Sequence, residues 1–283
     1  MTTVEDRPQT VTEMANETSK GQLLVEVTDH IGVITLNRPD RMNAISGPML
    51  STLSRTLIEF QRDPDVRVVV LTGAGRGFCA GLDLQDQGQR IASDDEMQVT
   101  PPAQLFDLRD APPIVLHRMD KPVICALNGA AAGYGMDLAL LCDIRLAGEH
   151  GKLAGVATKR NLLPESGGGW LLPRLVGWST AADILFRGRI VDAEECRELG
   201  LVAKVVPDDE LVDEAMSWAA DIAANAPLAV QATKRLMRLG VDETFEATVD
   251  HTLLELRVLM GMDDFKEGVS AFLDRRDPEF TGR

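Results

Sequence analysis

The sequence has little positive charge and lacks a long apolar run. It contains 29 Lys and Arg against 44 Asp and Glu, which gives a formal net charge of −15. Nucleic-acid binding and attachment to anionic membranes both need a basic surface, so neither partner is expected. No stretch approaches the ~18 consecutive apolar residues of a membrane-spanning helix. A small anionic ligand is still possible, because a few local Arg or Lys residues are enough to bind it.

Cysteine is also scarce. The four cysteines are widely spaced and include no CxxC pair: Cys79, Cys125, Cys142 and Cys196. This spacing suggests neither a zinc site nor a disulfide framework, so we expect a reduced cytoplasmic compartment and no metal.

No GxSxG motif is present, which disfavours a serine hydrolase. The first 20 residues lack an apolar run, and we expect a disordered lead-in rather than a signal peptide.

The remaining sequence has an α/β pattern that becomes mainly helical towards its end. Short apolar and β-branched runs predict strands at residues 23–27, 31–36, 66–72, 121–127, 143–147 and 201–206. Apolar residues at helical spacing predict helices after Ser46 and at residues 136–141, 168–175, 209–224, 228–239, 242–262 and 265–275. Polar residues dominate 83–104, which predicts a loop over a site. We expect a lead-in (1–20), an α/β core (21–206) and a helical region (207–283).

Two glycine-rich turns follow buried strands, at residues 73–81 and 129–135. The second opens a helix, whose free N–H groups suit an anion or an oxygen that becomes anionic. These glycines also fit a purely structural role, in which they pack strands against helices. A third interpretation is a dinucleotide-binding fingerprint at Gly75, Gly77 and Ala80. A polar segment follows it where a strand with an acidic end is required, which argues against nicotinamide binding.

Three segments together resemble the signatures of the crotonase (enoyl-CoA hydratase/isomerase) family. They are LNRPDRMNA at 36–44, GFCAGLDL at 77–84 and KPVICALNGAAAG at 121–133. The resemblance continues through FRGRIVDAEE at 186–195, LGLV at 199–202, APLA at 226–229 and GVSAF at 268–272. It covers the chain from about residue 22 to the end. The ordered set is far more specific than any one motif.

The resemblance implies a spiral of ββα units with C-terminal helices that form a homotrimer or a hexamer of two trimers. It also implies an acyl-CoA thioester as substrate, with coenzyme A as part of that substrate and no other cofactor. Two backbone N–H groups would hold the thioester oxygen. By position these donors are Leu82 and Tyr134. Because the donors belong to the main chain, the side chains at these positions can vary. The Tyr134 side chain either lines the acyl pocket or covers the helix end.

The resemblance also places the coenzyme A contacts. The backbone around Ala80, Asp83 and Leu84 would line the adenine pocket. Arg38 and Arg41 are candidates to contact the phosphates, and each fits a solvated surface charge equally well.

The acid/base residues depart from the two-glutamate pattern of hydratases that resemble this chain. Asp137 stands at the first of these two positions, three residues after Tyr134, and Ala157 stands at the second. Glu165 lies nearby in sequence, at a place that is acidic in the dienoyl-CoA isomerase branch. We therefore predict Asp137 and Glu165 as the catalytic pair, with burial raising their pKa values towards a useful range. Structural roles at the ends of helices are the alternatives for both residues.

The departure at residue 157 leaves the reaction open. Hydration of an enoyl-CoA, migration of its double bond and hydrolysis of the thioester are all compatible with the residues present. A family member that binds acyl-CoA without catalysis is a further alternative. The best-supported prediction is an enzyme of the hydratase/isomerase type that stabilises a thioester enolate.

Overall fold

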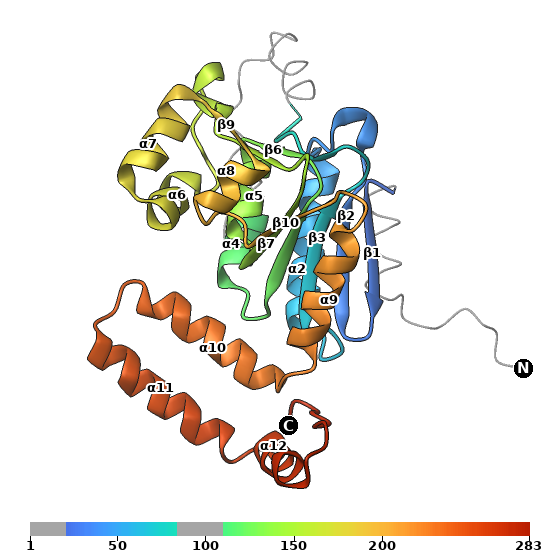
Figure 1. Cartoon of the computed structure of the whole chain (residues 1–283), viewed down its shortest axis with the longest axis vertical. Coiled ribbons are helices and arrows are strands. Elements are labelled where there is room, and N and C mark those ends of the chain that lie inside the picture. The colour runs from blue at the N-terminus through green and yellow to red at the C-terminus, as the bar shows by residue number, and fades with distance from the viewer. Residues whose placement is uncertain (1–20, 84–109) are drawn as a thin grey trace, which may run out of the picture.

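The computed structural model of the chain describes residues 21–83 and 110–283. The predicted lead-in, Leu84 and nearly all of the predicted loop at 83–104 lie outside these residues. Figure 1 shows an α/β core and, beside it, an arm of C-terminal helices.

The core is built on a six-stranded sheet in the order β1-β2-β3-β5-β7-β10. Its strands are β1 (Leu23–Thr28), β2 (Ile31–Leu36), β3 (Val68–Gly73), β5 (Val123–Leu127), β7 (Ile144–Gly148) and β10 (Lys204–Val206). The β1–β2 pair is antiparallel and the other pairs are parallel. Every residue of β3 and β5 is buried, as expected of continuous apolar strands covered on both faces.

A second sheet of short strands has the order β4-β6-β8-β9. Its strands are β4 (Gly77–Cys79), β6 (Ala130–Ala132), β8 (Lys152–Ala154) and β9 (Ile190–Asp192). The chain alternates between the sheets, because β3 leads into β4, β5 into β6 and β7 into β8. This alternation is the predicted spiral. A strand, rather than a helix, follows the glycines at 73–77, which removes the structural context that a dinucleotide fingerprint requires.

Helices cover both faces of the larger sheet. The core helices are α2 (Gly47–Arg62), α4 (Pro112–Arg118), α5 (Tyr134–Leu141), α6 (Gly168–Val176), α7 (Trp178–Arg187), α8 (Ala193–Glu198) and α9 (Leu211–Ala223), with 3-10 turns η1 (Pro39–Arg41) and η3 (Val156–Arg160). Ser46 caps α2 as predicted, because its side chain accepts a hydrogen bond from the Met49 N–H. On the opposite face of the sheet, Leu211, Ala215 and Ala219 of α9 belong to one buried cluster with residues of β3 and β5.

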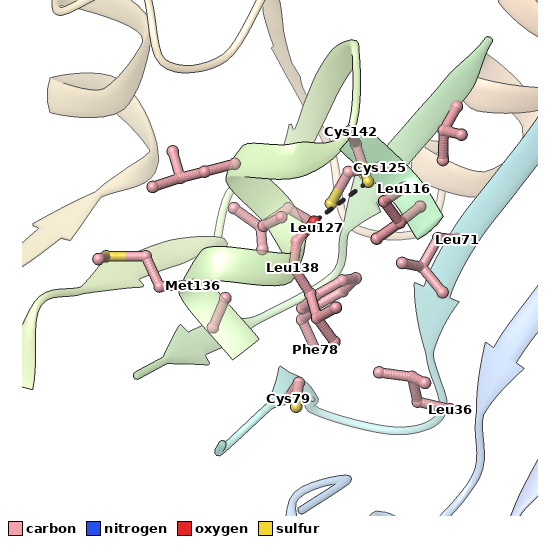
Figure 2. Close-up of a cluster of buried hydrophobic side chains, with 14 of the residues drawn as sticks. Leu36, Leu71, Phe78, Cys79, Leu116, Cys125, Leu127, Met136, Leu138 and Cys142 are labelled. Atoms are coloured by element: carbon pink, nitrogen blue, oxygen red, sulfur yellow. Dashed lines mark hydrogen bonds between the residues drawn. The ribbon is translucent and has the colours of Figure 1, made fainter. Parts of the chain in front are cut away.

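The main core lies beneath α5. Figure 2 shows Phe78, Leu127 and Leu138 packed together with the buried thiols of Cys125 and Cys142. The Cys142 Sγ contacts the Leu138 carbonyl oxygen at 3.4 Å. All four cysteines are buried free thiols, and their burial identifies them as core side chains. Packing against this core fixes the position of α5. Its first turn carries two of the predicted site residues, Tyr134 and Asp137.

The C-terminal arm consists of α10 (Pro227–Gly240), α11 (Phe245–Leu259) and α12 (Asp263–Asp274). Ion pairs hold α10 against the core. Lys234 pairs with Asp143 at 2.7 Å, and Arg235 and Arg238 pair with Asp120 at 2.7 Å and 2.8 Å. A cavity of about 780 Å³ lies between α10 and the core. Within the described residues, no helix combines the length and apolar character needed to cross a bilayer.

The C-terminus of α5 is held by a buried arginine. The guanidinium of Arg145 donates hydrogen bonds to the carbonyls of Ala139, Leu140 and Cys142 at the end of the helix, and to the Leu201 carbonyl. We expect Arg145→Met to lower the free energy of unfolding by about 3 kcal/mol, because the buried carbonyls lose a charged donor. Urea denaturation measures this loss. Arg187→Met, which breaks the exposed pair with Asp183, should change stability by less than about 1 kcal/mol. Equal effects of the two substitutions would contradict this role for Arg145.

Candidate active site

The Leu82 peptide is oriented by a short bridge to Ile45. The Ile45 N–H donates to the Gly81 carbonyl at 2.8 Å, and the Asp83 N–H donates to the Ile45 carbonyl at 3.0 Å. Leu82 is thus the bridge partner of Ile45. Its own N–H points away from Ile45, because the Gly81 carbonyl and the Leu82 N–H lie on opposite sides of a trans peptide.

The second glycine turn approaches this peptide closely. Gly81 has a φ of +103°, and a Cβ added to it would lie 3.0 Å from the Ala132 carbonyl oxygen and 3.7 Å from the Tyr134 nitrogen. A Cβ on Gly135 would lie 2.2 Å from the Cys79 carbonyl oxygen. The absence of side chains at these glycines therefore lets the start of α5 pack against the segment that carries Leu82.

Both predicted donors are available. Tyr134 is the first residue of α5, and the first N–H groups of a helix have no intrahelical acceptor. Within the described residues, neither the Leu82 N–H nor the Tyr134 N–H donates a hydrogen bond. Two backbone donors close together at the positive end of a helix suit an oxygen that gains negative charge during a reaction.

Polar side chains from the signature motifs fix the turn before Leu82. The buried Asn43 amide donates to the carbonyls of Ala74 at 2.9 Å and Gly77 at 2.7 Å. Arg38 donates to the Ala44 carbonyl at 2.6 Å and forms an ion pair with Asp83 at 2.9 Å. The Arg38 side chain is 15% exposed, so it is not a solvated surface charge. Its predicted contact with a phosphate would compete with the Asp83 pair.

Asp137 lies on the first turn of α5 and is completely buried. Its Oδ2 accepts a hydrogen bond from the Ser166 N–H at 2.9 Å, and its Oδ1 has no hydrogen-bond partner among the described residues. Burial raises the pKa of Asp137 to about 6. The backbone amides of Ser166 and Gly168 lower this pKa, and the charge of Glu165 raises it. A carboxylate in this range can accept a proton at neutral pH and return it.

The Tyr134 side chain is also buried, with a relative exposure of 6%, and its hydroxyl has no hydrogen-bond partner in the part of the chain that the structure describes. Burial raises its pKa above the ordinary value, and the charges of Cys79, Glu165 and Asp137 raise it further. The phenol therefore keeps its proton at neutral pH. Tyr134 and Asp137 are three residues apart on one helix, so their side chains share a face of α5.

The segment 164–168 packs over Asp137 and carries Glu165. A Cβ added to Gly168 would lie 2.1 Å from Asp137 Oδ1 and 3.2 Å from the Pro164 Cβ. Glu165 directly precedes Ser166, the hydrogen-bond donor to Asp137. Its side chain is exposed, so the burial expected for Glu165 is absent from the chain as described. The structure therefore places Leu82, Tyr134, Asp137 and Glu165 around one location.

A family model described as enoyl-CoA hydratase/isomerase matches residues 26–283, most of the chain. The chain belongs to the enoyl-CoA hydratase/isomerase family.

Curated relatives cover nearly the whole chain. The chain is 38% identical over 263 residues to the (E)-benzylidenesuccinyl-CoA hydratase of Thauera aromatica, covering 91% of this chain and 98% of the relative. It is 36% identical over 263 residues to the 1,2-epoxyphenylacetyl-CoA isomerase of Escherichia coli, covering 92% and 98%. A crystal structure of a putative enoyl-CoA hydratase from Streptomyces coelicolor superposes with a TM-score of 0.84 at 32% identity, covering 99% of this chain and 98% of that one. The predicted family and its α/β fold are confirmed.

The other residues predicted from the family signatures surround the Leu82 peptide or lie near it. Ala80 and Asp83 flank Gly81 and Leu82, and the Ala80 N–H donates to the Met42 carbonyl at 2.9 Å. Arg41 is exposed at the end of η1. The predicted adenine and phosphate contacts stay predictions, and Leu84 lies outside the described residues. Ala157 is buried on η3 and supplies no polar side chain.

Asn43 and Gly168 are site-supporting residues that the sequence interpretation left without a role. Asn43 lies in the first signature, and Gly168 lies in the glycine run at 167–169. Their partners come from turns far away in sequence, so their roles become visible only in the fold.

Across residues 21–83 and 110–283, no group of three or more His, Cys, Asp or Glu side chains is arranged to hold a metal ion.

Proposed function

We propose that this family member acts on an α,β-unsaturated acyl-CoA through an enolate-like state of its thioester. The proposal depends chiefly on the amides of Leu82 and Tyr134, which lie close to each other and donate no hydrogen bond within residues 21–83 and 110–283. A thioester oxygen between them would receive two hydrogen bonds that strengthen as negative charge develops. Each such donor is typically worth about 3 kcal/mol in the transition state.

Proton transfer would be the task of the carboxylates. Asp137 offers a buried oxygen, Oδ1, that is unpaired within the described residues, and a pKa suited to accepting and returning a proton at neutral pH. Glu165 lies beside it on an exposed segment, where exchange of protons with solvent is possible. In this proposal the amides hold the charge on oxygen while the carboxylates transfer the proton at carbon.

The names of two relatives indicate acyl groups larger than a simple enoyl chain, an epoxyphenylacetyl and a benzylidenesuccinyl group. We include such aryl-bearing thioesters among the candidate substrates. For assembly we propose a homotrimer or a hexamer, in the cytoplasm. Large apolar side chains on the arm support association, since Phe245, Leu254 and Phe272 are 78%, 61% and 83% exposed.

A panel of enoyl-CoA thioesters with mass spectrometry of the products tests this function. We expect addition of water or an unchanged mass with a moved double bond. Release of free coenzyme A would identify a thioester hydrolase instead. Tight binding of the thioesters with none converted would identify a non-catalytic binder, and no binding at all would refute the proposal.

Substitution of Glu165 tests its proposed role as the second carboxylate. We expect Glu165→Gln to lower kcat at least ~10²-fold, because the amide cannot exchange a proton with the substrate. Steady-state kinetics on the best substrate of the panel measures this loss. Glu198→Gln removes an exposed glutamate at the end of α8, so it should leave the rate unchanged. A near-normal rate in Glu165→Gln would leave Asp137 as the single acid/base group.

A further inference from the structure

Two buried side-chain polar atoms lack a hydrogen-bond partner in the described part of the chain. They are the Tyr134 hydroxyl and Asp137 Oδ1. Native structures rarely leave such atoms unpaired, because an unsatisfied buried polar group is unfavourable and usually indicates a missing water or ligand. Here the two residues that carry these atoms stand three positions apart on α5, so their side chains share a face of the helix.

The hydrogen-bonding properties of the pair define what fits between them. The phenol keeps its proton, so it can donate, whereas an ionised Asp137 Oδ1 can only accept. The two groups are not hydrogen-bonded to each other. A carbonyl or ether oxygen would satisfy Tyr134 alone, and an ammonium group would satisfy Asp137 alone. A water molecule or a hydroxyl group accepts from one and donates to the other.

We infer that Tyr134 and Asp137 hold the reacting water between them, and that the reaction is hydration of an enoyl-CoA. This inference depends on the proposed function and narrows it from hydration or isomerisation to hydration. Tyr134 then acts twice. Its amide binds the thioester oxygen, and its hydroxyl orients the water.

The chemical step balances with water as the co-reactant. Asp137 takes a proton from the water as its oxygen bonds to the β-carbon of the enoyl group. The electron pair of the carbon–carbon double bond moves towards the thioester oxygen, which is held by the two amides. The enolate then collapses as Asp137 and Glu165 together relay this proton to the α-carbon. The product is a 3-hydroxyacyl-CoA whose hydroxyl occupies the place of the water.

Tyr134→Phe tests the inference, because it removes one oxygen atom and keeps the ring. We expect kcat for hydration to fall at least ~10-fold with little change in KM, since a lost hydrogen bond of ordinary strength corresponds to about that factor. A 3-hydroxyacyl-CoA should bind the variant about 10-fold more weakly than wild type, whereas the saturated acyl-CoA should bind both equally. Isotope-labelled water should place its oxygen in the wild-type product.

Thr72→Val is the matched control, because it also removes a buried hydroxyl. Thr72 Oγ1 donates to the Ala126 carbonyl at 2.9 Å, so its bond lies within the fold. We expect Thr72→Val to lower the melting temperature and preserve the rate. Tyr134→Phe should preserve the melting temperature, because no bond inside the protein is lost.

The outcomes separate the inference from the proposed function. Wild-type hydration rates and unchanged 3-hydroxyacyl-CoA affinity in Tyr134→Phe would overturn the inference and leave the proposed function intact. A wild-type product with a moved double bond and no labelled oxygen would do the same. If the wild-type protein neither binds nor converts any acyl-CoA, the proposed function and the inference both fall.

Discussion

Asp137→Asn should lower kcat by 10²-fold or more, the lower part of the range for general acid–base catalysis. The amide is close in size to the carboxyl group and can still accept the hydrogen bond from the Ser166 N–H. It cannot take a proton from substrate or water, however. Steady-state kinetics with the best enoyl-CoA of the panel measures the loss. A near-normal rate would remove Asp137 from the proposed chemistry.

The pH dependence of the wild-type protein provides a second test of Asp137. The pKa of this carboxyl is raised by burial to about 6. As a base it must be ionised, so kcat/KM should fall as the pH drops through about 6, with about a tenfold loss per pH unit below it. A profile that stays flat down to pH 4.5 would show that another group accepts the proton.

The same pKa shift predicts that stability and activity respond to pH in opposite directions, since ionised Asp137 favours activity but lowers stability. Asp137 has a higher pKa when folded than when unfolded, so the folded state binds the extra proton between about pH 4 and 6. The stabilisation from this group is therefore fully present below about pH 4 and is lost as the pH rises through about 6. At pH 7.5 a buried charge remains without full compensation. Asp137→Asn should then raise the free energy of unfolding by about 1–3 kcal/mol while abolishing most activity.

Gly81→Ala should lower kcat/KM by about 10²–10³-fold, the effect of losing one donor from an oxyanion site. Residue 81 has a φ of +103°, and a Cβ there would meet the Ala132 carbonyl oxygen at 3.0 Å. To relieve this contact, the segment that carries Leu82 must move relative to the start of α5. The two amides then no longer converge. Kinetics and affinity for a saturated acyl-CoA should distinguish this loss from a general loss of binding.

Gly200→Ala is the control for backbone strain. Gly200 also has a positive φ, +72°, but an added Cβ would meet no atom within 4 Å. Both alanine variants should lose roughly 1 kcal/mol or more of stability, because alanine disfavours this backbone region. Only Gly81→Ala should lose activity. If Gly200→Ala lost activity to the same extent, strain alone would explain the effect.

Elements that carry their own local signal were predictable from the sequence. The apolar runs at 31–36 and 66–72 correspond to β2 and β3, and the helical spacing after Ser46 corresponds to α2. The individual strands of the second sheet were not predicted from their residues, although the family resemblance implied ββα units. These strands span three residues each, too few for an alternating pattern to stand out from the glycine turns around them. Short helices such as α4 and α8 were missed for the same reason.

In the candidate site too, features with a local sequence signal were predicted, and those that depend on tertiary contacts were not. Leu82, Tyr134, Asp137 and Glu165 were predicted because they stand at fixed offsets from recognisable motifs. The bridge from Ile45 and the cover that Gly168 provides over Asp137 depend on contacts between segments far apart in the chain. The exposure of Glu165 likewise depends on tertiary packing, which local composition does not report. The sequence therefore identified the candidate reacting groups, and the fold was needed to show what orients them.

The bridge between Ile45 and Leu82 has an evolutionary consequence. In the proposed function, peptide groups rather than side chains provide both electrophilic contacts, so mutations at positions 82 and 134 would alter the chemistry around the thioester without removing its activation. Position 134 is especially permissive, since its amide is fixed by the start of α5 whatever the residue there. The proposed activation of the thioester would therefore persist when a tyrosine at this position adds a second role, which offers a route by which one architecture diversifies its reactions.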